Sequence, residues 1–284
     1  MRLISFVITI LLLFNSCKTK SSRKIFDVHL HGSEEPAKQL DILSSANVYA
    51  VAISSSWDLQ QSYWGKSPIQ TLFGLMIPCP NGKVPYSLQS CFDDGKEWPP
   101  IEWVEEQIKA GKIDFFGEIL SQYHGISSSD SMLKPYYALA VKYDLPVGIH
   151  TGGAGPDHGC PNFKFELGDP SLLTGMLADH PNLRVWIMHA GDKYYKEAIK
   201  LMRMQKSVYA DISVIANPDI VPFNEFAAIM RSFMDAGLGD RLMFGTDNGD
   251  VEKMVRAVED IAFLSEVDKE KIFYRNAERF FHGD

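Results

Sequence analysis

The chain has 284 residues, of which 45% are hydrophobic, and a formal net charge of −8. This length suits one large α/β barrel, and the sequence contains no internal repeat or low-complexity block. The acidic balance argues against a nucleic-acid partner, which would need a basic footprint.

The N-terminal segment is expected to direct export and is not expected to be part of the fold. Arg2 precedes an apolar stretch, Leu3 to Phe14, that is too short to span a bilayer comfortably. The stretch ends at Cys17 and resembles a bacterial lipoprotein signal, although Phe14 stands where Leu is usual. We therefore expect a signal peptide over 1–16, a tether over 17–24, and lipidation of Cys17. These features predict a membrane-anchored protein of the cell envelope; the alternative is an ordinary cleaved signal with an incidental cysteine.

Eight apolar runs after this segment are typical of strands. Most are rich in Val, Ile, Phe and Met and are nearly continuously apolar, as in strands buried on both faces. They cover residues 25–31, 48–54, 71–78, 113–119, 146–151, 184–189, 208–213 and 241–246.

Helical patterns separate most of these runs. Asp130 and Asp169 are expected N-caps, and the connection 55–70 lacks a convincing helix. The expected helices cover residues 34–45, 101–110, 131–143, 170–179, 194–204, 222–236, 251–264 and 268–281. Repeated strand–helix alternation predicts a (β/α)8 TIM barrel, a single domain over 25–284. An open doubly wound sheet is the runner-up, weakened because no glycine-rich phosphate fingerprint follows the first strand.

Histidines and carboxylates stand at the ends of five of the expected strands. In a parallel barrel these ends open on one face, so the side chains would converge there. His29 and His31 share one face of the first strand, because strand residues two apart point the same way. Neutral imidazoles together with carboxylates suit Zn²⁺ or a similar divalent ion. The candidate metal ligands are His29, His31, Glu118, His150, His189 and Asp247.

Two carboxylates in this set have distinct expected roles. Asp247 can take a proton from a metal-activated water and pass it to a leaving group, which makes it the candidate general base. Glu118 can bridge two ions, complete one site, or orient a ligand histidine. The alternatives are a helix N-cap for Asp247 and a structural ion pair for Glu118.

Other residues on the expected active face are weaker candidates. His124, His158 and Lys164 lie in loops after the fourth and fifth strands and are candidates for substrate contact; exposed loop positions are the alternative. Cys79 and Cys91 bracket a loop rich in Pro, Gly and Ser, where an exported protein can hold a disulfide; two free thiols are the alternative.

Together these residues resemble the amidohydrolase superfamily, and within it the amidohydrolase-2, or amidohydrolase-related, branch of metal-dependent hydrolases. The resemblance rests on segments 27–31, 116–118, 148–152, 167–170, 187–191 and 244–247. It implies a (β/α)8 barrel with His29, His31 and Asp247 around a first metal. It also implies that His150 and His189 are ligands or catalytic groups that polarise the substrate. Many relatives carry a carbamylated lysine on the fourth strand, where this chain has Glu118, so one or two ions fit the pattern.

The expected function is that of a metal-dependent hydrolase acting on a small substrate. A metal-activated water would cleave an amide, ester, lactone or phosphoester bond. One alternative is a non-hydrolytic decarboxylase of the same superfamily. Another is a catalytically inactive ligand-binding lipoprotein, which the complete set of ligands disfavours. A homo-oligomer is compatible with either kind of enzyme.

Overall fold

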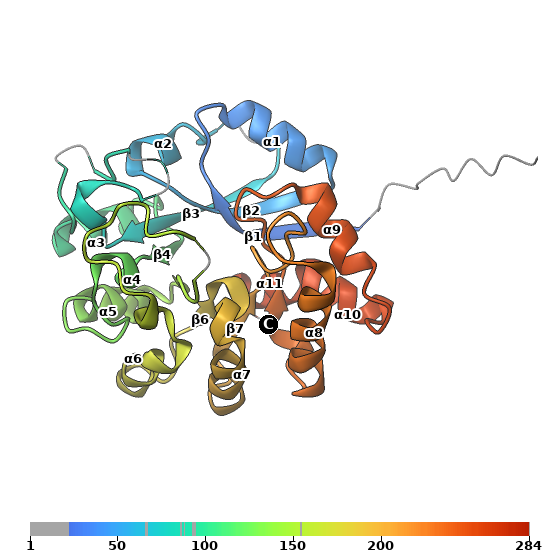
Figure 1. Cartoon of the computed structure of the whole chain (residues 1–284). Coiled ribbons are helices and arrows are strands. Elements are labelled where there is room, and N and C mark those ends of the chain that lie inside the picture. The colour runs from blue at the N-terminus through green and yellow to red at the C-terminus, as the bar shows by residue number, and fades with distance from the viewer. Residues whose placement is uncertain are drawn as a thin grey trace, which may run out of the picture.

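Eight parallel strands form a barrel with helices around it (Figure 1). The computed structural model describes residues 23–283, apart from 66–67, 86, 88, 93–94 and 154. The expected signal peptide and Cys17 lie outside the described residues. The (β/α)8 architecture expected from the sequence is confirmed, and the open doubly wound sheet is wrong.

The strands follow each other around the barrel in chain order. Their bounds are β1 Ile25–His31, β2 Val48–Ser54, β3 Gln70–Ile77, β4 Phe115–Ile119, β5 Val147–Ile149, β6 Val185–Ile187, β7 Val208–Asp211 and β8 Leu242–Met243. Backbone hydrogen bonds join the last strand region to the first. Val28 N donates to Phe244 O at 3.0 Å, and Asp247 N donates to His29 O at 2.7 Å. The first and last parts of the barrel are therefore in direct contact.

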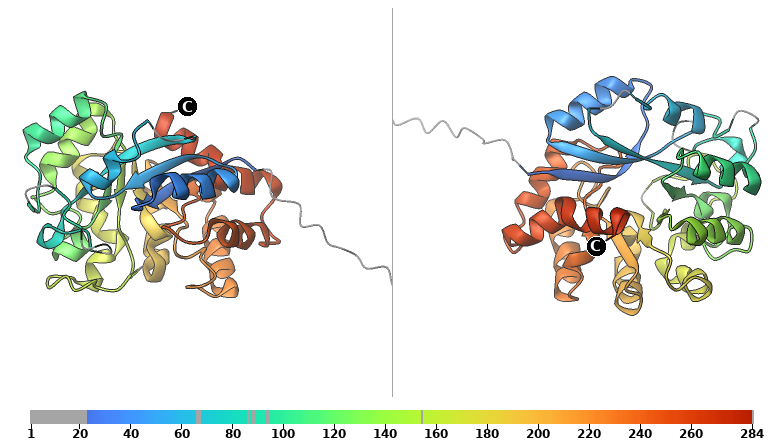
Figure 2. Two further views of the ribbon diagram at one scale, coloured as in Figure 1. Left: turned by 90° about the horizontal axis from the view of Figure 1, so that it is seen from above. Right: turned by 180° about the vertical axis from the view of Figure 1, so that it is seen from behind.

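The helices lie outside the strands (Figures 1 and 2). The α-helices are α1 Pro36–Ser45, α2 Trp57–Gln61, α3 Ile101–Lys109, α4 Ser121–His124, α5 Lys134–Tyr143, α6 Thr174–Asp179, α7 Tyr195–Met204, α8 Phe223–Asp235, α9 Val251–Glu259, α10 Glu266–Glu270 and α11 Asn276–His282. No helix within the described residues is both long and apolar enough to span a membrane.

The interior is divided into two hydrophobic layers. The larger cluster lies between the strands and the surrounding helices. The smaller one includes Phe26, Phe115 and Trp186 on the strands, together with Phe280 and Phe281 of α11. This helix crosses one end of the barrel, as the view from behind shows (Figure 2). Apolar side chains therefore fill this end and leave the carboxyl ends of the strands for polar groups.

Several expected helices differ from the observed ones; the one expected over 251–264, for example, ends at Glu259. The closing helix consists of α10, a π-helical segment Lys271–Arg275 and α11. Asp130 accepts from Met132 N at 2.9 Å in a turn that precedes α5, so it is not the N-cap. Asp169 accepts from Ser171 N at 2.8 Å and caps a 3-10 segment that leads into α6. Turn chemistry at these points competes with regular helix.

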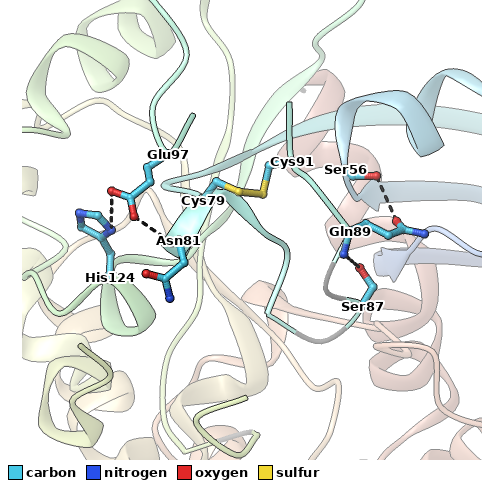
Figure 3. The surroundings of a disulfide bond; sticks show 8 residues. All are labelled: Ser56, Cys79, Asn81, Ser87, Gln89, Cys91, Glu97 and His124. Atoms are coloured by element: carbon cyan, nitrogen blue, oxygen red, sulfur yellow. Dashed lines mark hydrogen bonds and ion pairs between the residues drawn. A yellow bond between two sulfur atoms is a disulfide. The ribbon is translucent and has the colours of Figure 1, made fainter. Parts of the chain in front are cut away.

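A disulfide closes the loop after β3. Cys79 and Cys91 are bonded, with their Cα atoms 6.0 Å apart, so of the two alternatives left open by the sequence the bridge is the one present. Cys91 O accepts from Trp57 N at 2.9 Å, and Cys79 N donates to Glu97 O at 2.8 Å. The bridge therefore fastens the start of α2 to the loop after β3 (Figure 3).

Candidate metal centre

Four imidazoles and two carboxylates converge at the carboxyl ends of the strands. The Glu118 carboxylate lies 3.5 Å from His31 Nε2 and 3.7 Å from His189 Nε2. It lies 3.9 Å from the Nε2 atoms of His29 and His150. Three overlapping groups among the described residues have ligand atoms within 4.8 Å of one another: His29–His31–Glu118, Glu118–His150–His189 and His29–His189–Asp247. The structure thus brings together all six expected ligands.

Each of the four imidazoles is anchored through its Nδ1 atom. The Nδ1 of His31 lies 3.0 Å from Ser54 O, and that of His150 lies 2.9 Å from Gln122 Oε1. The Nδ1 of His29 lies 3.1 Å from Asp211 Oδ2. The Nδ1 of His189 lies 3.0 Å from Ser213 Oγ. Every Nε2 atom is therefore left for the centre of the cluster.

The partners of His31 and His150 show where the ring protons lie. A backbone carbonyl such as Ser54 O only accepts, so His31 donates from Nδ1. The Gln122 amide nitrogen donates to Gly152 O at 3.0 Å and to Phe165 O at 3.2 Å. Its Oε1 atom is consequently the acceptor that faces His150. Nε2 is therefore the atom through which each of these rings would bind a metal ion.

The buried Nε2 atom of His29 supports a metal at this point. It has no hydrogen-bond partner among the described residues, and the side chain is 1% exposed. A buried polar atom without a partner is costly, and a bound ion would supply the partner that this atom lacks. The donor set fits a divalent ion such as Zn²⁺, which takes imidazole nitrogens and carboxylate oxygens.

Asp247 is the more accessible of the two carboxylates. Its side chain is 20% exposed, against 3% for Glu118, and its Oδ1 lies 2.9 Å from His31 Nε2. Asp250, three residues on, supplies the N-cap of α9 by accepting from Lys253 N at 3.0 Å. Asp247 is therefore not the cap of that helix, and its partly exposed side chain faces the cluster.

Unusual backbone at two strand ends delivers ligands to the cluster. β6 ends at Ile187 and β8 at Met243, before His189 and Asp247. Both ligands have left-handed φ values, 60° and 48° respectively. Such conformations are strained for residues other than glycine and often mark functional sites. Gly245 allows the close approach, because a Cβ there would lie 2.9 Å from His29 Cβ.

Electrostatics around the cluster favours ionised carboxylates. Burial would raise the pKa of Glu118, but the contact with His189 at 3.7 Å and the other nearby imidazoles lower it to about 2. Burial is also outweighed at Asp247, where the hydrogen bond with His31 and the surrounding imidazoles hold the pKa below its usual range. Both groups are therefore charged and able to bind a cation at neutral pH.

The expected substrate-contact residues lie at different distances from this centre. His158 is half-buried and its ring lies 5.9 Å from that of Tyr123, which in turn lies 5.0 Å from the His150 ring. His124 Nδ1 lies 3.9 Å from Glu97 Oε2 in the loop beside the disulfide (Figure 3). Lys164 is exposed. Of the three residues, only His158 is separated from a candidate ligand, His150, by a single side chain, the ring of Tyr123.

Sequence reasoning missed three residues that anchor the imidazoles. Asp211, Ser213 and Gln122 are buried and contact His29, His189 and His150. Asp211 ends β7, so the signal used for the other strands, an apolar run closing on an ionisable residue, could have found it. Gln122 and Ser213 carry no comparable pattern.

The fold is a (β/α)8 barrel, and the carboxyl ends of its strands carry six side chains that could hold a divalent metal. The amidohydrolase family model matches residues 96–283, more than half of the chain, and the chain belongs to this family. Family members bind divalent metals and act on small molecules. No curated protein sequence matches the chain.

Solved structures with the same fold cover nearly the whole chain. An uncharacterized TIM-barrel protein from Bordetella bronchiseptica is 18% identical, with a TM-score of 0.63 over 90% of this chain and 98% of the other. A probable 2-pyrone-4,6-dicarboxylic acid hydrolase from Acinetobacter baumannii is 13% identical, with a TM-score of 0.62 over 91% and 99%. A manganese-bound 5-carboxyvanillate decarboxylase from Novosphingobium aromaticivorans is 16% identical, with a TM-score of 0.55 over 86% and 79%. At these identities the likeness concerns the fold.

Proposed function

We propose that the protein is a metal-dependent hydrolase of a small substrate. The observation that carries this proposal is the position of Asp247. Its carboxylate is ionised, partly exposed and 2.9 Å from His31 Nε2, beside a cluster suited to a divalent ion. A carboxylate in this place can accept a proton from an attacking water, which is the task of a general base in hydrolysis.

The six converging residues would hold the ion. When bound, a divalent metal such as Zn²⁺ lowers the pKa of water and polarises a substrate oxygen. The imidazoles are suited to ligation, since His31 and His150 hold a proton at Nδ1 and turn Nε2 toward the cluster. Burial lowers the pKa of His150 to about 3, and its neutral ring cannot donate a hydrogen bond from Nε2 to a substrate. This supports a ligand role for His150 over the polarising role that the sequence left open.

Asp247 would act twice in one turnover. It first takes the proton of the water that attacks the scissile carbonyl or phosphoryl group, and it then gives that proton to the leaving group. Glu118, with 3% of its side chain exposed, is too enclosed to exchange protons with a substrate in this way. The surrounding imidazoles lower the pKa of Glu118, which keeps this carboxylate charged as a ligand.

The bond cleaved is an amide, ester, lactone or phosphoester. Lactones are the first class to test, because one structural neighbour is described as a probable hydrolase of a 2-pyrone dicarboxylic acid. The hydrolysis screen should be accompanied by elemental analysis of the purified protein. Activity that disappears with a chelator and returns with Zn²⁺ would support the proposal.

Asp247→Asn tests the general base. Asparagine is nearly isosteric but cannot take the proton at neutral pH, so we expect turnover to fall by roughly 100-fold or more. Asp250→Asn is the matched control: it makes the same change three residues away, in a cap that asparagine also supplies. A rate near wild type in Asp247→Asn would refute the assignment.

A decarboxylase is the second candidate, because a 5-carboxyvanillate decarboxylase shares the fold. Its substrate would carry a carboxylate, and a basic side chain near the cluster would favour this chemistry. Lys164, the candidate from the sequence, is exposed, and its backbone N donates to Gln122 O at 3.3 Å. Release of CO2 from aromatic acids, without hydrolysis of any ester, lactone, amide or phosphoester, would favour the decarboxylase.

We also propose that the enzyme is exported and held at a membrane by a lipid on Cys17. The apolar stretch that ends at Ser16-Cys17 supports this proposal. The described chain begins at Arg23, whose Nε lies 2.5 Å from Glu259 of α9, and β1 starts at Ile25. A tether that enters at the start of β1 would leave the metal centre at the far end of the barrel, open to substrate.

A further inference from the structure

We infer that Asp211 is a positioning residue that sets the ring protons of two metal-binding imidazoles. It would act on His29 directly and on His189 through the hydroxyl of Ser213. This inference rests on the proposed metal site and adds to it the group that keeps these two histidines in the binding form. Asp211 is 0% exposed and ends β7, which pairs with β6, the strand that precedes His189.

One carboxylate oxygen of Asp211 accepts hydrogen bonds from three donors. Its Oδ1 accepts from the backbone N of His189 at 3.0 Å and from the backbone N of Ser213 at 3.0 Å. It also accepts from the hydroxyl of Ser213. The first two groups are amides that can only donate, so this oxygen must be an acceptor.

The other oxygen faces the imidazole of His29. Asp211 Oδ2 lies 3.1 Å from His29 Nδ1. An ionised carboxylate has no proton to offer, so the proton between these atoms belongs to Nδ1 of the ring. The Nε2 atom of His29 has no hydrogen-bond partner among the described residues and is the atom of this ring that a metal ion would take. In metal sites a carboxylate behind a histidine commonly fixes the ring in this way.

Ser213 carries the effect to the second imidazole. Its hydroxyl donates to Asp211, so the oxygen is free to accept from His189 Nδ1, which lies 3.0 Å away. The same oxygen lies 3.1 Å from His29 Nδ1, so the two rings share one hydroxyl. A single carboxylate therefore holds the protons of both rings on the side away from the metal.

Asp211→Asn should reverse the arrangement at His29. The three donors around Oδ1 require an acceptor, so the amide oxygen takes that place and the NH2 group takes the place of Oδ2. An NH2 group facing His29 Nδ1 donates to it, which moves the ring proton to Nε2. Protonated Nε2 cannot bind a metal ion, so affinity should fall by about 10- to 100-fold.

Asp27→Asn is the matched control. Asp27 is also a buried aspartate, and it also contacts His29, but through the backbone N at 3.1 Å. Its remaining bonds go to the backbone N and the hydroxyl of Thr246. The amide oxygen of asparagine can accept from the two backbone N atoms, and its NH2 group can donate to the Thr246 hydroxyl. The variant therefore removes a buried carboxylate but places no NH2 group opposite a ring nitrogen.

The experiment compares the two variants in the full chain. Affinity for Zn²⁺ is measured by competition with a chromogenic chelator. The position of each histidine proton is read from long-range ¹H–¹⁵N spectra of the metal-free protein. Thermal unfolding of the metal-free proteins shows whether each variant is folded. Neither metal affinity nor the spectra require a substrate, so failure of the hydrolase proposal and failure of this one are separable.

Two results would support the inference. Asp211→Asn should bind Zn²⁺ more weakly than wild type, whereas Asp27→Asn should bind it as wild type does. The ring proton of His29 should move from Nδ1 to Nε2 in Asp211→Asn. Equal affinities in the two variants, or His29 unchanged in Asp211→Asn, would overturn the inference. If Asp211→Asn does not fold, Ser213→Ala replaces it. In that variant His189 should lose its preference for Nδ1–H while His29 keeps it, and unchanged His189 spectra would count against the relay.

Discussion

Replacing Glu118 by glutamine tests how many metal ions the centre holds. The carboxylate of Glu118 is the group shared by two of the three potential ligand groups. It faces His31 through one oxygen and the other three imidazoles through the second. A carboxylate in this place either bridges two ions or serves one. Because no lysine is available for carbamylation at this position, we expect one tightly held ion.

The size of the effect follows from the buried charge. Two unit charges about 4 Å apart interact by about 4 kcal/mol at an effective dielectric constant of about 20. Glutamine keeps one oxygen that can ligate but removes the charge. Zn²⁺ carries two charges, so we expect its binding to weaken by at least about a thousand-fold, since each 1.4 kcal/mol is about a factor of ten.

Titration of the metal-free full chain with Zn²⁺ measures both affinity and stoichiometry. Glu252→Gln provides the control, because Glu252 is exposed on α9 and its carboxylate lies 3.6 Å from Arg256. We expect one ion per chain in wild type and in both variants, with weaker binding only in Glu118→Gln. A stoichiometry of two that falls to one in Glu118→Gln would refute the single-ion expectation and establish a bridge. Unchanged affinity would refute the charge argument itself.

Three further predictions concern other parts of the chain. His29→Ala and His31→Ala should each lose metal and activity, with binding weakened on the order of several kcal/mol; full metal occupancy of the double variant would contradict the site. Replacing Cys79 and Cys91 by serine should lower the free energy of unfolding by about 3 kcal/mol for a loop of this length, as measured with denaturant; equal midpoints with and without the bridge would contradict this estimate. Cys17→Ser should release the protein into the soluble fraction or block its processing, and a variant that stays membrane-bound at the mature size would exclude lipidation.

The strands were predictable because strands buried on both faces leave a clear apolar pattern. The expected runs coincide with all eight observed strands, but the later ones end sooner than expected. β6 stops at Ile187 and β8 at Met243, because the chain leaves the sheet to place His189 and Asp247. An apolar run does not show where such a left-handed turn begins, because the turn is stabilised by contacts in the assembled site.

The ligands were predictable, but the groups behind them were not. His29 and Asp211 are 182 residues apart in the sequence, and Ser213 is 184 residues from His29. No local spacing connects such pairs, and a buried serine or glutamine has no pattern that separates it from a packing residue. The interrupted closing helix was equally hidden, because its π-helical segment keeps a helical pattern of apolar residues.

The contact between the first and last strands has a consequence for how the protein matures. Asp247 N bonds to His29 O, so two groups of the centre meet across the seam where the barrel closes. During synthesis β1 emerges long before Asp247, which comes last of the six candidate ligands in the sequence. Contacts between such distant parts of a chain form late, because loop closure must come first. A nascent chain that stops short of Asp247 therefore lacks part of the centre.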